Sequence, residues 1–429
     1  SILLVDRTAP RSSELLARVV RFAMKFQLYT APAMAKGLED TALYVYNRLV
    51  SVNEVGDDPR HLGTSPGAFH HANQERLQNW PHAMLATSTH DAKRSEDVRA
   101  RINVLSELGE EWRVHLGRWS RVNRSKKRLV DGQPAPSRND EYLLYQTLIG
   151  AWPLEKLDER GLDAFRRRIE EYMLKAAREA KVDTSWINPN TEYEEAVARF
   201  VRRLFGTNGH TPFLADFLPF QARVARFGLR NSLSQTLLKL LSPGVPDLYQ
   251  GTELWTFSLV DPDNRRPVDF ELRRTLLEEL ARRSSEQPLH ELTRTLCEQL
   301  PDGRAKLYLT WRALHLRRDD PELFQLGEYL PLAADGPYAG HLCAFARRRE
   351  QREVVGIAPR WLATLSHANA SSDAVMPALP DTTVELPSAG PFVNALTGRS
   401  VEPTEQDGQY RFAVDQLLSD FPVALLTRR

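Results

Sequence analysis

Hydrophobic and polar positions follow a helical period over most of this chain. From residue 95 to about residue 205, apolar side chains recur every three or four positions and charged residues fill the opposite face. The pattern predicts helices at residues 12–25, 141–151, 162–180, 193–204, 213–241 and, with interruptions, 270–318.

Short β-prone runs separated by glycine and proline replace this pattern beyond Glu328. Their spacing predicts a small antiparallel β domain with strands at 341–347, 353–357, 382–386, 392–396, 410–414 and 423–426. Two earlier strands are predicted at 84–88 and within the proline- and glycine-bounded stretch 243–253.

The strand at 84–88 stops on the pair His90–Asp91 and then turns into a charged helix start. Residues at the C-terminal ends of such strands carry the chemistry of (β/α)₈ enzymes, so Asp91 is the first catalytic candidate. The alternative is that Asp91 only caps a helix beginning near Ala92. Lys93, Arg94 and Arg99 are ambiguous in the same way, because Glu96 and Asp97 at the helix start supply them with structural partners.

The segment 36–55 mixes acids, tyrosines and asparagines in a way that predicts a short helix and a loop, after a proline-interrupted loop at Ala31–Pro32. A loop of this kind can hold a sugar through hydrogen bonds and ring stacking. The candidate residues are Lys36, Glu39, Asp40, Tyr44, Tyr46, Asn47 and Arg48. The alternative is that Lys36 is solvated and the tyrosines only pack.

A second polar group follows the strand in 243–253. Loops after the last strand face the pocket of a (β/α)₈ barrel, which makes these residues binding candidates. They are Tyr249, Glu253, Trp255, Asp261, Asp263, Asn264, Arg265 and Arg266. The alternative is an internal ion-pair network that ties the loop to the barrel.

The composition limits the classes of ligand and partner that this chain can be expected to bind. The 57 basic and 56 acidic side chains nearly cancel, which argues against nucleic acid and against an anionic membrane surface and suits a neutral substrate. No apolar run could span a bilayer and the N-terminus lacks a signal-peptide core, so a soluble protein is expected. Two cysteines, Cys297 and Cys343, exclude a disulfide framework and fit the cytoplasm.

The histidines and tryptophans give little evidence for a metal site or a sugar-binding site. His70 and His71 are adjacent and cannot close a metal site without distant ligands, so no metal is predicted. Trp80, Trp152 and Trp186 could stack on sugars, but a lone tryptophan more often belongs to a core or an interface.

Several longer segments carry a family resemblance. They are 34–41 (MAKGLEDT), 44–48, 53–56, 80–84, 88–91 (STHD), 93–99, 141–146, 184–186, 243–253 (PGVPDLYQGTE) and 261–269. Over about two thirds of its length the chain resembles the maltooligosyltrehalose synthase family, which belongs to the α-amylase superfamily (glycoside hydrolase family 13). Ala92 stands where threonine is expected and Asp57 where glycine is expected.

The resemblance implies an α/β fold: the C-terminal part of a (β/α)₈ TIM barrel with a large helical insertion, followed by an antiparallel β-sheet domain. The implied division is 1–94 for the later barrel and substrate loop, 95–210 for the insertion, 211–325 for the closing strand and helices, and 326–429 for the β domain. The chain begins on Ser1 with what looks like the end of a strand, so we expect a fragment.

Retaining glycosyl transfer in such enzymes uses a nucleophilic carboxylate and an acid/base about 5 Å apart. The resemblance places His90 and Asp91 in a third role, stabilising the transition state. It implies substrate binding by Lys36, Glu39, Asp40, Tyr44, Tyr46, Asn47, Arg48, Lys93, Arg94, Tyr249, Glu253, Asp263 and Arg265. No nucleophile or acid/base is assigned, since Asp6, Glu39 and Glu54 are more simply surface or loop acids.

The implied activity is an isomerase reaction of trehalose biosynthesis without a cofactor. It converts the reducing-end α-1,4 linkage of a maltooligosaccharide to an α,α-1,1 linkage by intramolecular transglucosylation. The implied partners are an α-1,4-glucan and the N-terminal half of the same enzyme, without which this chain is expected to be inactive. The alternatives are an α-glucan hydrolase or transglycosylase of the same superfamily and a non-catalytic glucan-binding fragment.

Overall fold

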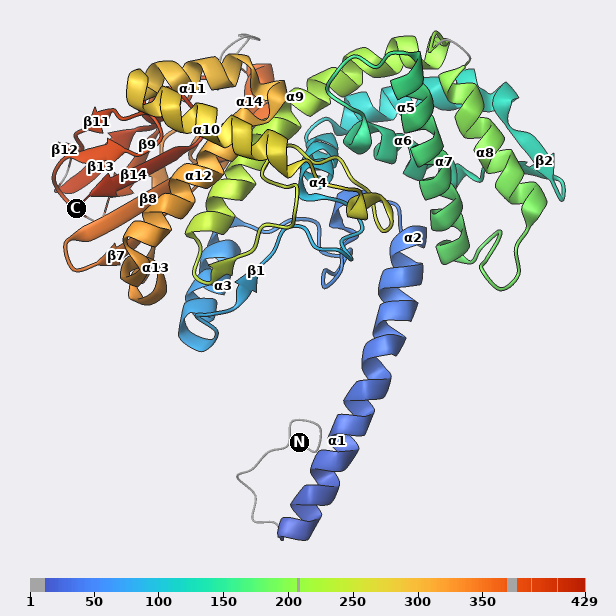
Figure 1. Cartoon of the computed structure of the whole chain (residues 1–429), viewed down its shortest axis with the longest axis horizontal. Coiled ribbons are helices and arrows are strands. Elements are labelled where there is room, and N and C mark those ends of the chain that lie inside the picture. Colours follow the sequence, from blue (N-terminus) through green and yellow to red (C-terminus); the bar gives the residue numbers. More distant parts are fainter. Residues whose placement is uncertain (1–11, 207–208, 369–375, 387, 407, 429) are drawn as a thin grey trace.

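The computed structural model describes residues 12–428 apart from 207–208, 369–375, 387 and 407, and it is mainly helical with small sheets (Figure 1). The strand end expected at residues 1–6 lies outside the described residues. The α-helices are α1 (Ser13–Met34), α2 (Leu43–Val45), α3 (Pro66–Asn79), α4 (Glu96–Asn103), α5 (Gly109–Asn123), α6 (Arg138–Ala151), α7 (Glu159–Ala180), α8 (Thr191–Phe205), α9 (Pro212–Leu241), α10 (Phe270–Glu286), α11 (Leu289–Glu298), α12 (Arg304–Asp319), α13 (Pro321–Leu326), α14 (Leu362–Ala368) and α15 (Val414–Leu418).

The strands are short and most of them lie in the last quarter of the chain. They are β1 (Met84–Leu85), β2 (Arg128–Val130), β3 (Gln133–Ala135), β4 (Val245–Pro246), β5 (Glu328–Pro331), β6 (Ala334–Asp335), β7 (Leu342–Arg349), β8 (Arg352–Pro359), β9 (Thr383–Leu386), β10 (Phe392–Asn394), β11 (Ser400–Val401), β12 (Thr404–Gln406), β13 (Gln409–Ala413) and β14 (Ala424–Arg428).

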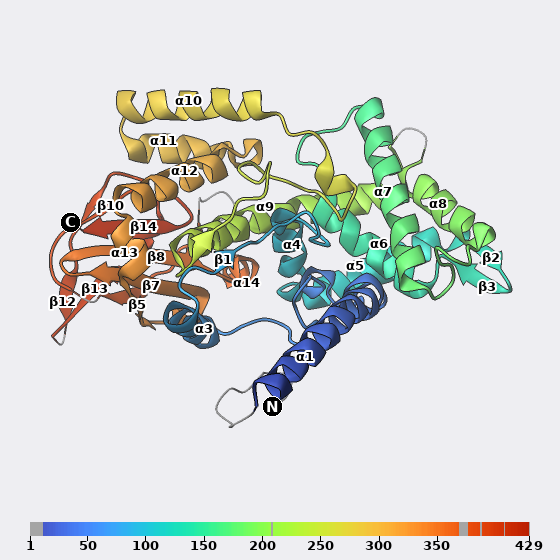
Figure 2. The same ribbon diagram turned by 60° about the horizontal axis from the view of Figure 1, so that its bottom comes forward.

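Helix α1 projects away from the rest of the molecule (Figures 1 and 2). The Ser12 hydroxyl caps it by accepting a hydrogen bond from the amide of Leu15. The predicted loop at Ala31–Pro32 is wrong, because the helix passes through Pro32 and continues as a π-helix over Ala35–Ala42. Proline leaves the carbonyl of Leu28 without its helical donor. That residue is 72% exposed, so water can satisfy the carbonyl.

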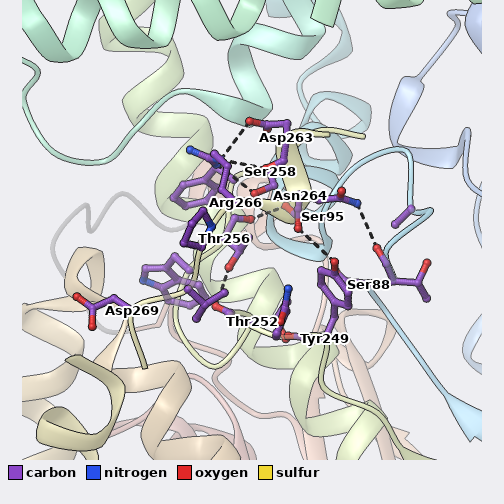
Figure 3. Close-up of a pocket in the computed structure, with 18 of the residues that line it drawn as sticks. Ser88, Ser95, Tyr249, Thr252, Thr256, Ser258, Asp263, Asn264, Arg266 and Asp269 are labelled. Carbon is purple, nitrogen blue, oxygen red and sulfur yellow. Dashed lines mark hydrogen bonds and ion pairs between the residues drawn. The ribbon is translucent and has the colours of Figure 1, made fainter. Parts of the chain in front are cut away.

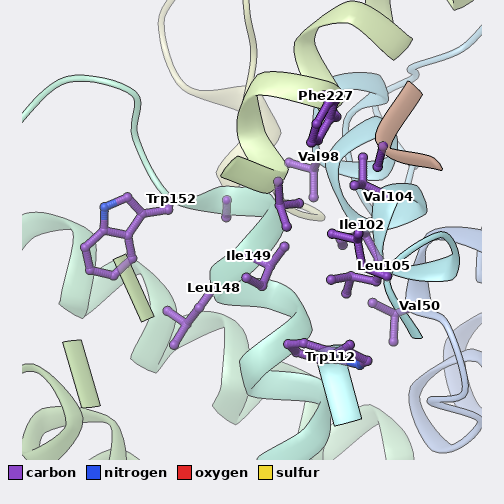
Figure 4. Close-up of a cluster of buried hydrophobic side chains, with 14 of the residues drawn as sticks. Val50, Val98, Ile102, Val104, Leu105, Trp112, Leu148, Ile149, Trp152 and Phe227 are labelled. Carbon is purple, nitrogen blue, oxygen red and sulfur yellow. The ribbon is translucent and has the colours of Figure 1, made fainter. Parts of the chain in front are cut away.

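The helices predicted between residues 138 and 241 are confirmed as α6, α7, α8 and α9. They enclose an apolar core in which Val98, Ile102, Ile149 and Phe227 meet (Figure 4). The hairpin β2–β3 was not predicted. Its turn residues Asp131 and Gly132 both have positive φ, and Asp-Gly is a strong hairpin signal in a sequence.

The predicted antiparallel sheets are present in the C-terminal quarter. One has the strand order β11-β10-β14-β8-β7-β5 and the other has the order β12-β13-β9-β6. Strand β8 explains why the sequence of this region shows continuous apolar runs, because each face of the strand contacts a different core. Val355 and Ile357 belong to the core that includes the second sheet. Val354 and Ala358 belong to the core around α9 and α12. Both faces of β8 are therefore buried.

The expected barrel is not seen. Among the described residues, the parallel pairing is confined to β1 and β4, with Met84 opposite Val245 and Leu85 opposite Pro246. The strand expected at 84–88 ends at Leu85. Thr87 and Ser88 then use their side chains as hydrogen-bonding groups, Thr87 with Glu96 and Ser88 as acceptor from the amide of Glu96. What the structure shows is thus two adjacent parallel strands at the base of the region described next.

Candidate functional site

The turn that carries His90 and Asp91 connects β1 to α4. The amide of Asp91 donates to Thr89 Oγ1 at 3.2 Å, and both candidate side chains are exposed. Helix α4 begins at Glu96 with Ser95 as its N-cap residue. The interpretation of Asp91 as a helix cap is therefore wrong, and its carboxylate is free of that structural duty.

A buried ionic cluster fixes the start of α4. Lys306 Nζ of α12 lies 2.6 Å from Glu96 Oε1 and 3.0 Å from Asp97 Oδ2, while Lys239 Nζ of α9 lies 3.6 Å from Glu96 Oε2. Burial opposes the charge on Glu96, yet the two ammonium groups lower its pKa to about 2. Burial likewise opposes the charge on Lys306, but the two carboxylates raise its pKa. Glu96 and Asp97 were expected to pair with Lys93, Arg94 and Arg99, and that expectation is wrong.

Glu54 holds the segment after the catalytic candidate. Its carboxylate accepts hydrogen bonds from the amides of Lys93 at 2.7 Å and Arg94 at 3.2 Å, and Arg99 lies 3.8 Å away. Glu54 lies in a loop, as one of the two predicted alternatives has it, but it is only 6% exposed and so is not a surface acid. Glu39 is half-buried and accepts from the amide of Gly56, whereas Asp6 lies outside the described residues.

The structure brings Lys36, Asp40 and Lys93 together beside this turn. Asp40 Oδ1 lies 2.9 Å from Lys93 Nζ, and Asp40 Oδ2 lies 2.5 Å from Lys36 Nζ. Burial would raise the pKa of Asp40, but the two ammonium groups hold it below its usual value. Lys36 is exposed and its pKa is raised by Asp40, with a smaller contribution from Asp91. The charge of Asp91 is therefore felt at the Lys36 ammonium.

The remaining predicted residues of this segment divide between packing and exposure. Tyr44 is buried against Lys93, and Asn47 is buried with its carbonyl accepting from Gln146, whereas Tyr46 and Arg48 are exposed. Arg94 is 1% exposed and its guanidinium donates to the carbonyl of Val50 and the hydroxyl of Tyr172.

A cavity of about 260 Å³ opens between the His90–Asp91 turn and the loop that follows β4 (Figure 3). Asn264 joins its two walls: its Nδ2 donates to the carbonyl of His90 at 2.9 Å, and its own carbonyl accepts from the hydroxyl of Tyr249 at 3.2 Å. Five predicted residues line this cavity: Tyr249, Trp255, Asp263, Asn264 and Arg266. Other polar lining residues were not among the predicted binding residues, and these include Ser88, Thr89, Ser95, Thr252, Thr256, Ser258 and Asp269.

Ion pairs also organise the loop, as the alternative interpretation expected. Asp263 pairs with Arg168 of α7 at 2.7 Å and accepts from the amide of Leu259. Glu253 pairs with Arg273 at 3.0 Å. Arg265 is exposed beside Asp261. Asp263 and Glu253 thus hold the loop in place.

The other aromatic and metal candidates are placed as follows. Trp152 packs in the core, while Trp80 and Trp186 are 72% and 54% exposed. His70 Nδ1 forms a hydrogen bond with the hydroxyl of Tyr329. Within the described part of the chain there is no group of three or more His, Cys, Asp or Glu side chains placed to hold a metal ion. In the same part, no helix combines the length and hydropathy that crossing a bilayer requires.

No family model matches this sequence. A Mycobacterium tuberculosis protein, provisionally named maltooligosyl trehalose synthase, is 36% identical over 406 residues, which are 95% of this chain and 45% of that protein. The chain is a relative of the maltooligosyltrehalose synthases. It spans about half the length of the curated relatives it matches, which is consistent with a C-terminal part of such a synthase.

Solved synthases agree with this relationship. The structure of maltooligosyltrehalose synthase from Arthrobacter ramosus superposes with a TM-score of 0.75 at 36% identity, covering 92% of this chain and 45% of that one. A second maltooligosyl trehalose synthase crystal structure gives a TM-score of 0.71 at 33% identity, covering 99% and 50%. A hypothetical maltooligosyl trehalose synthase of Sulfolobus tokodaii gives 0.69 at 30% identity, covering 98% and 51%.

Proposed function

We propose that this chain supplies the transition-state-stabilising side of a glucosylmutase active site, which acts on maltooligosaccharides in trehalose biosynthesis. The reaction converts a reducing-end α-1,4 linkage to an α,α-1,1 linkage. The observation that carries the proposal is the exposed Asp91 carboxylate at the end of a parallel strand pair, beside Lys36, Asp40 and Lys93. The names of the relatives supply the reaction class.

The role of Asp91 follows from the chemistry of the sugar ring. As the ring flattens toward an oxocarbenium ion, its C2 and C3 hydroxyls become better hydrogen-bond donors. A carboxylate that accepts from them binds the transition state more tightly than the ground state. We expect His90 and the Lys36 ammonium to hold neighbouring hydroxyls, and Tyr46, Arg48, Tyr249 and Arg265 are further candidate contacts. Arg94, Tyr44 and Asn47 are buried, and we propose that they hold these candidate residues in position from the protein interior.

Water must be kept from the glycosyl intermediate, because hydrolysis would otherwise compete with the return attack by the released glucose. The segment 36–48 and helix α7 are the walls we propose for that purpose. They are already connected, since Lys181 Nζ at the end of α7 lies 2.9 Å from Thr41 Oγ1. Net retention at the donor carbon and no cofactor are expected.

The nucleophile and the acid/base are proposed to come from the half of the synthase that this chain does not span. We propose that this half completes a (β/α)₈ barrel around β1 and β4, with residues 1–94, 95–210, 211–325 and 326–429 as later barrel, helical insertion, closing barrel and β domain. Exposed apolar residues support a contact there: Leu28 and Tyr29 on α1, Met84 on β1 and Val245 on β4. The free thiols of Cys297 and Cys343 favour a cytoplasmic location.

A second candidate is a glucan-binding fragment without turnover. The observation that favours it is the vicinity of Asp91, where the acidic neighbours Asp40, Glu54 and Asp263 are all engaged by basic or amide groups. None of them is left as a nucleophile. A hydrolase or transglycosylase of the same superfamily would share this half-site, and its product would distinguish it.

The test is to incubate maltopentaose with the 429-residue chain, alone and together with the missing half of a related synthase, and to follow loss of reducing ends and product linkage. We expect a trehalosyl product only from the combined halves, and at least 10³-fold less with Asp91→Asn. Free glucose as main product would replace the mutase by a hydrolase. Turnover by the chain alone would show that it holds its own nucleophile.

A further inference from the structure

A second and larger cavity lies in the helical region, away from Asp91. It has a volume of about 1260 Å³ and opens between α5, α6, the α7–α8 connection and the hairpin β2–β3. It shares no lining residue with the cavity beside the His90–Asp91 turn. Ligand pockets for small molecules are commonly about 300–1,000 Å³, so this space can take more than a single sugar ring.

Charged side chains of both signs line this cavity between apolar ones, and their charges balance. Four basic side chains line it: Arg121, Arg124, Lys127 and Arg138. Four acidic side chains line it as well: Asp131, Asp140, Glu141 and Asp183. An anion or a cation would meet as much repulsion as attraction there. A neutral ligand whose groups both donate and accept hydrogen bonds fits such walls best, and sugar hydroxyls have that property.

Hydrogen bonds and an ion pair already hold several lining side chains of the cavity in place. Glu141 accepts from the hydroxyl of Tyr145 at 2.7 Å and pairs with Lys127 at 2.7 Å, and both acid and tyrosine are at least 95% buried. The hydroxyl of Tyr193 donates to Asp140. A carboxylate has about four lone-pair positions, so each acid keeps acceptor capacity toward the cavity.

The cavity lies next to the loop proposed to hold substrate. Two of its lining residues bond directly to that loop: Asn139 Nδ2 donates to the carbonyl of Val45 at 2.9 Å, and Tyr142 donates to the carbonyl of Arg48 at 3.0 Å. The segment between Val182 and Asn190, which also borders the cavity, carries the exposed Trp186 with its ring over Arg178 at 4.8 Å. Residues 45–48 are therefore direct neighbours of the cavity wall.

From these observations we infer that the cavity between α6 and the β2–β3 hairpin is an additional binding site for a neutral α-1,4-glucan segment. It holds part of a long chain, or a neighbouring chain, outside the pocket of Asp91. The inference rests on the proposed function for its ligand class. It predicts that long maltooligosaccharides contact the protein in two separate regions.

The test is hydrogen exchange of the 429-residue chain with saturating maltoheptaose. We expect slower exchange in peptides covering 128–140 and 182–193 as well as in those covering 36–48 and 86–94. In a triple variant of exposed lining residues, Arg124→Ala, Gln133→Ala and Asp183→Ala, the protection at 128–140 and 182–193 should fall at least fivefold while that at 36–48 remains. Arg274→Ala on α10 is the control and should leave all four regions protected.

The outcomes separate the inference from the proposed function. Protection at 36–48 without protection at 128–140 would overturn the second site and leave the function standing. No protection in any region would remove the glucan as ligand altogether. Equal protection of the cavity by inorganic phosphate would make it an anion site, and equal protection by cellohexaose would remove the preference for α-1,4 linkage; either result would overturn the inference as stated.

Discussion

The ammonium of Lys306 lies 2.6 Å from a carboxylate oxygen of Glu96, and both side chains are almost completely removed from solvent. This pair connects α12 to the first turn of α4, directly after the segment that carries Asp91. Asp97 and Lys239 complete the cluster, so two acids and two bases balance inside the protein. The position of the candidate catalytic turn therefore depends on groups that cannot touch a ligand.

Removing one member of this cluster should destabilise the fold strongly. Lys306→Met leaves the two buried acids Glu96 and Asp97 with Lys239 as the only base of the cluster, and loss of one partner of a buried pair costs about 3–5 kcal/mol. Urea unfolding at pH 7 measures the change in unfolding free energy. The exposed pair of Arg282 and Glu286 on α10 gives the control, since Arg282→Ala should change stability by less than about 1 kcal/mol. Equal effects of the two substitutions would refute this role for Lys306.

The same cluster predicts a loss of stability in acid. The pKa of Glu96 is lowered from 4.5 to about 2 in the folded protein, so its contribution is fully present above pH 4.5 and is lost as the pH falls through 2. The pKa of Asp97 is raised by burial, and this works in the opposite direction. Glu96→Gln should therefore make the urea midpoint less dependent on pH between 5 and 3 than in the unsubstituted chain. An unchanged dependence would mean that Glu96 is not the group that titrates.

Much of the fold could be predicted from the sequence because its elements are long or regular. Helices α6 to α9 keep a clear apolar period, and the strands β7 to β10, β13 and β14 stand between glycine and proline breaks, whereas β11 and β12 were not predicted. The extent of the strand at 84–88 could not be predicted. Thr87 and Ser88 look β-prone in sequence, but their hydroxyls bond to Glu96 and so end the strand after Leu85.

The candidate site could be predicted only in part, because its contacts also depend on residues that are distant in the sequence. Polar residues near Asp91 could be named from the sequence, but many of their partners could not, because several of the pairs join positions far apart in the chain. Glu54 binds the amides of Lys93 and Arg94 across some forty positions, and Asn264 binds the carbonyl of His90 across 174. A sequence shows which residues can form such bonds, and only packing shows which do.

Asn264 should control the His90–Asp91 turn without carrying the fold. Its amide bonds to two carbonyls of the turn, at 2.9 Å to His90 and 3.3 Å to Thr89. Asn264→Ala removes both, and each lost hydrogen bond of this kind costs about 0.5–1.5 kcal/mol. We expect maltopentaose turnover by the combined halves to fall about tenfold or more, with a change in Tm of only a few degrees. Asn264→Asp retains the oxygen but loses the donor and should behave like alanine; recovery of activity by aspartate would contradict the argument.

Gly244 allows the backbone of β4 to lie close to that of β1. Its substitution therefore tests how much the β1–β4 pairing contributes to stability and turnover. Its φ is +124°, and an added Cβ would lie 2.7 Å from the carbonyl oxygen of Ala83, which accepts the hydrogen bond of Val245 in the strand pair. Backbone strain of this sort costs about 1–3 kcal/mol, so Gly244→Ala should lower the unfolding free energy by at least that much and reduce glucan turnover as the turn after β1 shifts.

Gly117 in α5 is the matched control, because nothing lies within 4 Å of its added Cβ and its φ is ordinary. Gly117→Ala should stabilise the chain by about 0.4–1 kcal/mol through the unfolded state. Urea unfolding of both variants decides the matter: if Gly244→Ala is as stable as Gly117→Ala, the β1–β4 pair does not depend on this close approach.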